Sequence, residues 1–365
     1  MAALDEIRSP SAAHMVIGGR EILNFGGSCY LGLSGHPSLI EAGIAAVKEQ
    51  GSTSQLARHY NFALAANIEA EEAARDFFGT DGAIYFATGY MFGLIACGGL
   101  AEDFDVAILD EGAHWNLADG ARAAQKEVRT FKHCDADDLE SVISQVVGQG
   151  LRPLVGTDGM FATIGHSPPL DRYAELLEPH QGWLLVDESH SFGSLGERGR
   201  GACEHFGISG PRIVSGGSMG KAFCAHGGLA VGAAEVIAKL WQSFGAKGAV
   251  SGTSMGAAMT AASLRYVQAH PEWLEKLRNN SNSLKAMLSG IGLEPQTTAS
   301  SVCAFERGSA AEMQRIQQSL WEGDIFVIYS RYIGSGPEGT LRIAAFADHS
   351  AEDFERLEAA LVKLI

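Results

Sequence analysis

The chain has 365 residues, of which 46% are hydrophobic and 19% charged, so it can bury a large core and does not have the composition of a disordered chain. Its formal net charge of −16 disfavours nucleic acid and anionic membranes as partners, because both repel an acidic surface. The first ten residues lack a signal-peptide pattern, so we expect a cytoplasmic protein with reduced thiols. The cysteines lack the spacing of metal ligands, so we expect no bound metal. They are Cys29, Cys97, Cys134, Cys203, Cys224 and Cys303.

The N-terminal third predicts a hairpin followed by two helices. Two short apolar runs flank Gly18-Gly19 within residues 12–25, which is typical of a hairpin. Apolar residues at helical spacing predict helices over 36–50 and 66–78. Residues 83–101 are almost uncharged and about as long as a membrane span, but four glycines and a TGY turn favour a buried strand, a turn and a buried helix.

The middle of the chain alternates between strands and helices, which indicates a mostly parallel sheet in an α/β fold. We predict strands at 83–87, 106–109, 153–157, 182–186 and 213–215, with helices near 90–101, 137–149 and 171–177. Ligands of such sheets bind at the carboxyl ends of the strands. Polar residues follow five of the predicted strands and are expected to gather at that edge; they are Thr88, Asp110, Asp158, Asp187 and Ser218.

Beyond about residue 255 the pattern changes to that of a smaller α+β domain. Helices dominate 256–290, followed by a strand at 301–306, a helix at 309–321, a strand at 340–345 and a terminal helix at 351–365. The sequence therefore predicts an N-terminal segment (1–35), a large domain (36–255) and a small C-terminal domain (256–365).

The segment WLLVDESHSFGSLGERGRG, residues 183–201, delivers Asp187 at the end of an apolar strand, with His190 three residues later. A carboxylate in this place can pair with a protonated pyridine nitrogen and strengthen the ring as an electron sink. His190 can lie near such a ring or its phenolic oxygen. Taken alone, the segment is better explained by an aspartate that caps the following turn and a solvated histidine.

The segment SGGSMGKAFCAHGG, residues 215–228, holds Lys221 among small and apolar residues. Burial of this kind lowers the pKa of a lysine and frees its amine to form a Schiff base. Ser218 offers a hydroxyl to a phosphate, and the neighbouring glycines let the backbone approach a ligand. The alternative is a surface lysine in a glycine-rich loop, which the lack of other charges from Val214 to Ala225 disfavours.

Two further segments are weaker indications of a ligand site. In FATGYMFG (86–93), a strand runs through Thr88, Gly89 and Tyr90 into a helix, whose N-terminal N–H groups can bind phosphate. In DEGAHWN (110–116), either His114 or Trp115 can lie flat on a planar cofactor, or the aromatic residue can belong to the core.

Together, the order and spacing of these segments resemble the α-oxoamine synthase family of fold-type-I enzymes that depend on pyridoxal 5'-phosphate (PLP). The resemblance begins at GREILNF and CYLGLSGHP (19–37) and runs through VDESHSFGSLGERGRG. It continues through SMGKAF and SGTSMGAA (251–258), and ends at TLRIAAFADHSAEDFERL (340–357). It implies the fold-type-I architecture, a PLP cofactor and a homodimer with shared active sites.

The resemblance also implies a role for individual residues. Lys221 would form the Schiff base with PLP and move protons at the substrate α-carbon. Asp187 would pair with the pyridine nitrogen, while His190 would contact the phenolic oxygen and His114 would stack on the ring. The remaining implied roles are phosphate binding by Thr88, Gly89, Tyr90 and Ser218, phosphate binding in the partner subunit by Thr253 and Ser254, and substrate binding by Arg342, Arg58 and Tyr30. In particular, Arg342 would grip the amino-acid carboxylate, a task that suits a guanidinium.

Several positions depart from the family pattern, mostly around the substrates. Cys29 stands where an Asn is usual, Phe62 where a Gly is expected and Asn67 where a His is expected. In the segment TDGMFATIG, Asp158 replaces a Glu, Ala162 replaces a Ser that helps to seat the cofactor, and Ile164 replaces an acidic residue. The resemblance therefore supports PLP chemistry more firmly than any particular second substrate.

Three functions follow from these observations. The leading hypothesis is a PLP-dependent acyltransferase that condenses an amino acid with an acyl thioester, either acyl-CoA or an acyl carrier protein, to an α-amino ketone. The second is a PLP-dependent aminotransferase, lyase or decarboxylase on the same fold. The third is a non-catalytic partner subunit, which the presence of Lys221 disfavours. The sequence leaves open the amino acid, the acyl donor, the pathway and any decarboxylation.

Overall fold

The computed structural model describes residues 4–296, 298–332 and 335–365, which form two compact units. The larger unit comprises residues 36–160 and 167–270, and the smaller comprises residues 1–35, 161–166 and 271–365. The helix Ser254–Ala269, most of which the sequence analysis assigned to the small domain, groups with the larger unit. Each unit is described by itself below.

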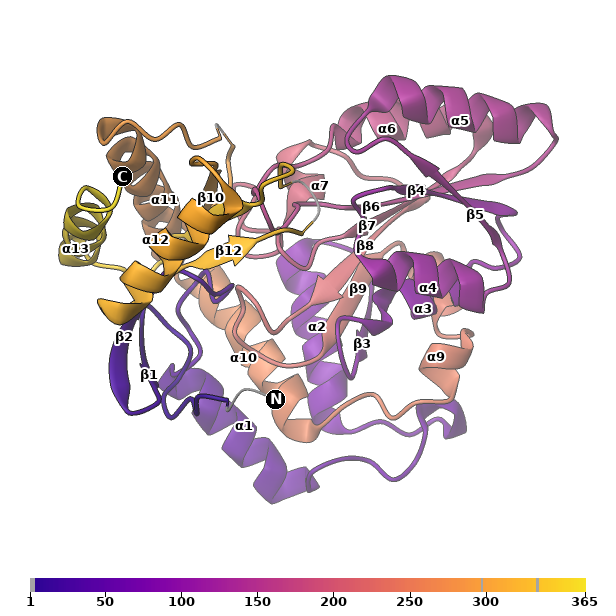
Figure 1. The fold of residues 1–365 in the computed structure, drawn as a ribbon. Helices are drawn as coiled ribbons and strands as arrows, with labels where there is room; N and C mark the ends of the chain where they lie inside the picture. The colour runs from indigo at the N-terminus through magenta and orange to yellow at the C-terminus, as the bar shows by residue number, and fades with distance from the viewer. Residues whose placement is uncertain (1–3, 297, 333–334) are drawn as a thin grey trace. The chain divides into compact units, whose positions relative to one another are not determined.

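A seven-stranded sheet with the order β3-β9-β8-β7-β6-β4-β5 forms the centre of the larger unit (Figure 1). Strands β4 to β8 run parallel, whereas β9 pairs antiparallel with both β3 and β8. The strands are β3 (Gly82–Phe86), β4 (Val106–Asp110), β5 (Glu127–Phe131), β6 (Pro153–Asp158), β7 (Trp183–Asp187), β8 (Ile213–Ser218) and β9 (Gly228–Gly232). This is the predicted α/β fold with a mostly parallel sheet.

Helices cover the sheet because its central strands are buried along their whole length and mostly apolar up to the polar residues at their carboxyl ends. Strands β4, β6 and β7 are buried at every position, as expected of parallel strands covered on both faces. Helices α5 and α6 pack together along one side of the sheet (Figure 1), and α3, α4 and α8 contribute to an apolar core with the strands. These helices are α3 (Met91–Gly99), α4 (Trp115–Ala123), α5 (Ala136–Gly148), α6 (Leu170–Leu177) and α8 (Ala234–Leu240).

The remaining helices of the larger unit include a packed group of three, in which α10 contacts both α1 and α2. Helix α1 begins with a proline in its first turn and ends at Gly51, whose φ of 75° is favourable for glycine. The group consists of α1 (Pro37–Gln50), α2 (Ala65–Phe78) and α10 (Ser254–Ala269). The short helices are η1 (Arg58–Tyr60), η2 (Glu178–His180), α7 (Ala202–His205) and α9 (Phe244–Lys247).

The described residues of the smaller unit form two three-stranded sheets, β1-β2-β11 and β10-β13-β12, and three helices. Its core consists of apolar residues from α11, α12, α13 and the strands beside them. The strands are β1 (His14–Ile17), β2 (Arg20–Asn24), β10 (Val302–Phe305), β11 (Ile325–Phe326), β12 (Ile328–Ser330) and β13 (Thr340–Ala344). The helices are α11 (Glu272–Gly290), α12 (Ala310–Glu322) and α13 (Ala351–Leu361).

The structure confirms the predicted hairpin, with β1 and β2 paired around Gly18-Gly19, and the strand, turn and helix predicted over 83–101. Within the described residues, no helix combines the length and the apolar character that a membrane span requires. Two strands of the sheet were missed. The edge strand β5 reads EVRTF and is only partly buried, and β9 reads GLAVG, so neither shows a clear strand pattern.

A buried histidine in the smaller unit links its stability to pH. The His349 ring stacks on Phe25 and Phe346, with centroids 4.1 and 5.0 Å apart. Its Nδ1 accepts a hydrogen bond from the Phe346 N–H at 2.8 Å. Its Nε2 lies 3.1 Å from the Asn24 carbonyl oxygen, which is an acceptor, so Nε2 is the nitrogen that carries the proton. Burial lowers the pKa of His349 to about 4, so the ring is neutral in the folded chain.

We predict that stability falls as the pH drops from about 6.5, the ordinary pKa of histidine, towards about 4. Between these two pH values, His349 is protonated in the unfolded chain but not in the folded chain. Once the pH is below both pKa values, the free energy of unfolding is lower by about 3 kcal/mol. Urea unfolding at several pH values measures the loss. The variant His349→Gln cannot titrate and should show a shallower pH dependence; an unchanged slope would contradict the assignment.

Candidate active site

Three neighbouring strands of the larger unit end in buried carboxylates, as predicted. Asp110 ends β4, Asp158 ends β6 and Asp187 ends β7, with exposed fractions of 2, 9 and 4%. Strands β4, β6 and β7 are adjacent and parallel, and Asp158 and Asp187 are direct register partners. The carboxyl edge of the sheet therefore holds a row of acidic groups.

Asp187 is held by two donors, one on each oxygen. Its Oδ2 accepts from the Asn116 side-chain amide at 2.9 Å, and its Oδ1 accepts from the Ser189 N–H at 2.9 Å. Each carboxylate oxygen can still accept a second donor. His190 is half-buried on the turn that follows β7. The sequence analysis missed Asn116, although it lies within the segment DEGAHWN.

Lys221 lies on a compact loop between β8 and β9. The loop is closed by the Met219 N–H to Gly227 carbonyl bond at 3.0 Å and the Cys224 N–H to Lys221 carbonyl bond at 2.9 Å. Lys221 is half-buried, and its charge lowers the pKa of Asp158, which places the ammonium near the carboxylate row. The structure thus brings Lys221 to the same edge of the sheet as Asp187.

His114 lies beside this row at the start of α4. Its backbone N–H donates to Asp158 Oδ1 at 3.0 Å, and its half-buried ring meets Tyr90 edge-on, with centroids 5.8 Å apart. Tyr90 in turn donates its hydroxyl to Asp119. Trp115 is 61% exposed, so neither aromatic residue of DEGAHWN belongs to the core.

The turn before α3 and the end of β8 form a close-packed cradle that fits a phosphate. A Cβ added to Gly89 would meet Ser218 Cβ at 2.5 Å, so only glycine fits here. The first turn hydrogen bonds are those of Met91 N–H to Thr88 and Phe92 N–H to Gly89, which leaves the Gly89 and Tyr90 N–H groups ahead of the helix. The Ser218 hydroxyl accepts the Gly220 N–H at 3.1 Å and can donate to a ligand.

The donor set therefore fits PLP, the cofactor that the resemblance implies. N–H groups at a helix N-terminus and a hydroxyl suit its phosphate, a carboxylate suits its ring nitrogen, and an amine suits its aldehyde. In this arrangement, Gly89, Tyr90 and Ser218 would hold the phosphate, with Asp187 at the ring nitrogen and Lys221 at the aldehyde.

Thr253 and Ser254 lie at the start of α10. The Thr253 hydroxyl caps the helix by accepting the Gly256 N–H at 3.0 Å, and its backbone bridges to Thr53. Ser254 is buried, and its hydroxyl donates to the Gly51 carbonyl. Within one chain these two residues join α10 to the segment after α1.

Arg58 forms a structural ion pair within the larger unit. Its guanidinium donates to both oxygens of Glu71, the second at 2.7 Å, and stacks on Trp241 at 3.9 Å from the ring centroid. Glu71 also accepts the Tyr85 N–H at 3.0 Å, and burial raises its pKa. A bidentate pair of this kind holds Arg58 in one orientation.

The smaller unit places Arg342 and Tyr30 in direct contact. Arg342 is 5% exposed and donates to the carbonyls of Ala162, Gly26 and Gly27 at 2.6, 2.9 and 3.1 Å, and to the Tyr30 hydroxyl at 3.2 Å. Burial raises the pKa of Tyr30, so all of these acceptors are neutral. Within the described residues, these bonds solvate the Arg342 charge without neutralising it.

The positions that depart from the family pattern have distinct surroundings. The Cys29 thiol donates to the Ser11 carbonyl at 2.7 Å, and the Asn67 amide donates to the Ser251 carbonyl at 3.3 Å. Phe62 is 58% exposed, and Ile164 is 9% exposed. Ala162 contributes its carbonyl to Arg342.

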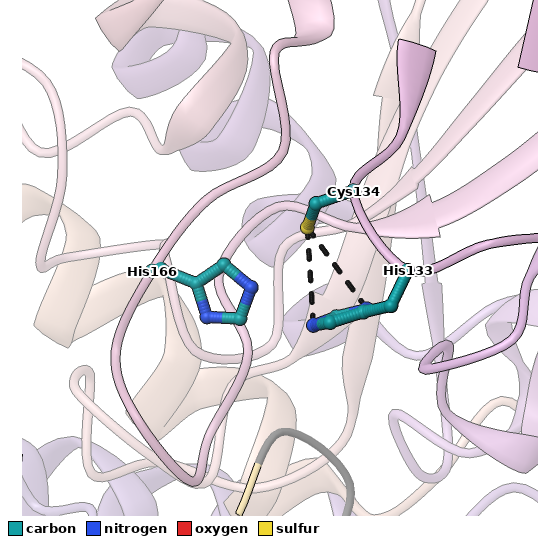
Figure 2. Close-up of side chains that lie close together, drawn as sticks. All are labelled: His133, Cys134 and His166. Carbon is teal, nitrogen blue, oxygen red and sulfur yellow. Dashed lines mark hydrogen bonds between the residues drawn. The ribbon is translucent and has the colours of Figure 1, made fainter. Parts of the chain in front are cut away.

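The sequence analysis placed Asp110 at the end of β4 but did not predict its partners His133 and Cys134. His133 Nδ1 lies 2.7 Å from Asp110 Oδ1, and the Cys134 N–H donates to Asp110 Oδ2 at 2.9 Å. The Cys134 thiol is 3.9 Å from both nitrogens of the His133 ring (Figure 2). Burial and the charges of Asp110 and Asp158 raise the pKa of Cys134, so its thiol is protonated and a poor nucleophile.

Comparisons with known proteins identify the family to which the chain is similar. Residues 20–361 match the aminotransferase class I and II family. The chain is 34% identical over 352 residues to the 8-amino-7-oxononanoate synthase of Thioalkalivibrio sulfidiphilus, covering 95% of this chain and 89% of that protein. It is 29% identical to the serine palmitoyltransferase of Sphingobacterium spiritivorum, with 98% and 90% covered. A solved serine palmitoyltransferase from S. paucimobilis, which holds PLP joined to myriocin, superimposes with a TM-score of 0.90 at 26% identity, with 98% and 92% covered.

Proposed function

The chain belongs to the aminotransferase class I and II family and, within it, to the PLP-dependent α-oxoamine synthases. We propose that it condenses an amino acid with an acyl thioester to give an α-amino ketone. The proposal rests mainly on one observation: Lys221, Asp187 and the Gly89–Ser218 cradle lie at the same edge of the sheet. Two of the relatives, an 8-amino-7-oxononanoate synthase and a serine palmitoyltransferase, support this class of reaction.

When bound, PLP supplies a ring that stabilises negative charge at the α-carbon of the amino acid. The chain supplies the remaining functions. Asp187, held by Asn116 and Ser189, would accept the N–H of the cofactor ring and favour the protonated form of that nitrogen. The Lys221 amine would take a proton from the α-carbon or return one to it, and His114 would help to hold the cofactor.

We propose that Arg342 binds the carboxylate of the amino acid. A buried guanidinium whose acceptors are all neutral favours a negatively charged ligand, because such a ligand neutralises the charge that carbonyls only solvate. Tyr30 contributes by fixing one arm of the guanidinium. Arg58 remains a proposed substrate contact, with its charge already paired to Glu71. We propose that the carrier of the acyl group is CoA or an acyl carrier protein.

We also propose a homodimer with shared active sites. Large apolar side chains of the larger unit stay exposed in a single chain, which favours burial against a second copy. Several of them lie on α1, on the following segment and on α10, namely Ile40, Ile44, Leu56, Phe62 and Met255. Thr253 lies at the start of α10 and would reach the partner's phosphate. All six cysteines are reduced, which supports the proposed cytoplasmic location.

The function predicts release of free CoA that depends on an amino acid and an acyl-CoA together. A thiol reagent measures the release while purified enzyme is screened against amino acids and acyl-CoAs, with an acyl carrier protein as the second donor. Lys221→Ala should lose the visible absorbance of the cofactor and the activity, whereas Lys239→Ala, at an exposed pair with Asp103, should keep both. Keto-acid formation without a thioester would instead indicate an aminotransferase.

Arg342→Lys should raise the KM for the amino acid by about tenfold or more and change PLP affinity much less, because the ammonium cannot reproduce the planar guanidinium contacts. Tyr30→Phe removes one acceptor and should have a smaller effect in the same direction. Substrate titration and PLP titration of the two variants give the two quantities. An equal loss of amino-acid and PLP binding would argue against a carboxylate role.

Shared sites predict that two inactive variants rescue each other. Thr253→Asp keeps a good helix cap but brings a negative charge to the partner's phosphate, so it should be inactive alone, as is Lys221→Ala. In a random mixture of dimers, about one quarter of the sites carry neither change, so about a quarter of the activity should return on co-expression. If the co-expressed pair stays inactive, or Thr253→Asp is active alone, each site is built from one chain.

A further inference from the structure

The three carboxylates at the strand ends differ in how they are supported. Asp110 accepts from Gly112 N–H, His133 Nδ1 and Cys134 N–H, at 2.7, 2.7 and 2.9 Å. Asp187 accepts from Asn116 and Ser189. Asp158 accepts, within the described part of the chain, from the backbone N–H of His114 at 3.0 Å. A buried carboxylate is stable when several donors solvate its charge, so Asp158 is the member of the row least suited to carry one.

The surroundings of Asp158 decide its charge. Its register partner on the parallel strand β7 is Asp187, and neighbouring strands lie about 4.8 Å apart. Two buried negative charges at that separation repel strongly. The other titratable groups that face it are Asp110 on β4, Cys134 after β5 and Lys221 after β8.

The contributions to the Asp158 pKa have opposite signs. Burial and the charges of Asp187 and Asp110 raise it, whereas the His114 N–H and Lys221 lower it. The net shift is well upward, which agrees with the poor solvation of this carboxyl group.

We infer that Asp158 is a positioning residue that acts as a neutral carboxylic acid: it anchors the backbone of His114 at the start of α4 and leaves Asp187 as the charged member of the pair. This rests on the proposed function, since His114 and Asp187 take their roles from it. When Asp158 is neutral, the pair carries one negative charge, which is on Asp187. Asp187 can then accept the ring N–H without a second carboxylate that attracts the same group. An ionised Asp158 would attract the same positive charge.

Thermal unfolding of the cofactor-free protein tests the charge state independently of activity. A folded pKa above the unfolded value of about 3.9 means that Asp158 costs stability increasingly as the pH rises from about 4 through the folded pKa. Asp158→Asn cannot titrate and avoids this cost. Its Tm minus that of the wild type should therefore grow by about 3 °C or more between pH 4 and 7. The matched control Asp171→Asn removes an exposed carboxylate on α6 and should show a much smaller change of the Tm difference with pH.

A Tm difference for Asp158→Asn that does not change with pH would overturn the inference. This result does not depend on whether PLP binds or the proposed reaction occurs. If the wild type develops no visible absorbance with PLP, the proposed function fails, and the titration of the cofactor-free protein still decides the charge of Asp158.

Spectra of the PLP-loaded protein test the positioning role. The pH midpoint of the Schiff-base absorbance should stay within about 0.3 units of the wild type in Asp158→Asn, whose amide oxygen still accepts the His114 N–H. Asp158→Ala removes that acceptor and should weaken PLP binding by about tenfold, and the Asn variant should restore it. A midpoint lowered by a unit or more in the Asn variant, or normal PLP binding in the Ala variant, would refute the role.

Discussion

The crowding of buried carboxylates at the ends of β4, β6 and β7 is the constraint on which the candidate site depends. Parallel strands in register bring Asp158 and Asp187 side by side, and water is largely excluded from both. Such a row persists only if each charge is solvated by donors, paired with a cation or removed by a proton. The chain uses all three solutions, with backbone and amide donors for Asp187, the nearby ammonium of Lys221, and a proton on Asp158.

The loops around this row are fixed by further buried hydrogen bonds, which gives the site its rigidity. The buried Glu188 carboxylate accepts the N–H groups of Ala202 and Cys203 at 2.7 and 2.9 Å and so folds the loop after β7 against the start of α7. The Ser189 hydroxyl accepts the Ser218 N–H at 2.9 Å and joins that loop to the end of β8. A cofactor site built in this way is preorganised before any ligand binds, because its donors already point in fixed directions.

The smaller unit has the opposite imbalance of charge, because it buries a cation instead of anions. Arg342 donates to three carbonyls and one phenol, so its charge is solvated but not cancelled. Arg58 in the larger unit shows the contrast, since Glu71 neutralises it and Trp241 covers it. Two arginines that the sequence analysis treated alike as substrate contacts are thus physically different, one suited to an anionic ligand and the other already satisfied within the chain.

The sequence by itself determined the α/β fold and the strands that lead to the candidate site, and it singled out Lys221, Asp187 and the Gly89 turn as candidate site residues. Local periodicity predicts the fold, and the family resemblance implies the roles of these residues. It missed β5 and β9, whose polar or glycine-rich segments become strands only because neighbours pair with them. Only the tertiary structure decided that Asp158 faces Asp187 and that Arg58 is neutralised. Register, burial and charge partners depend on residues far apart in the chain, and such long-range contacts leave no mark on local sequence.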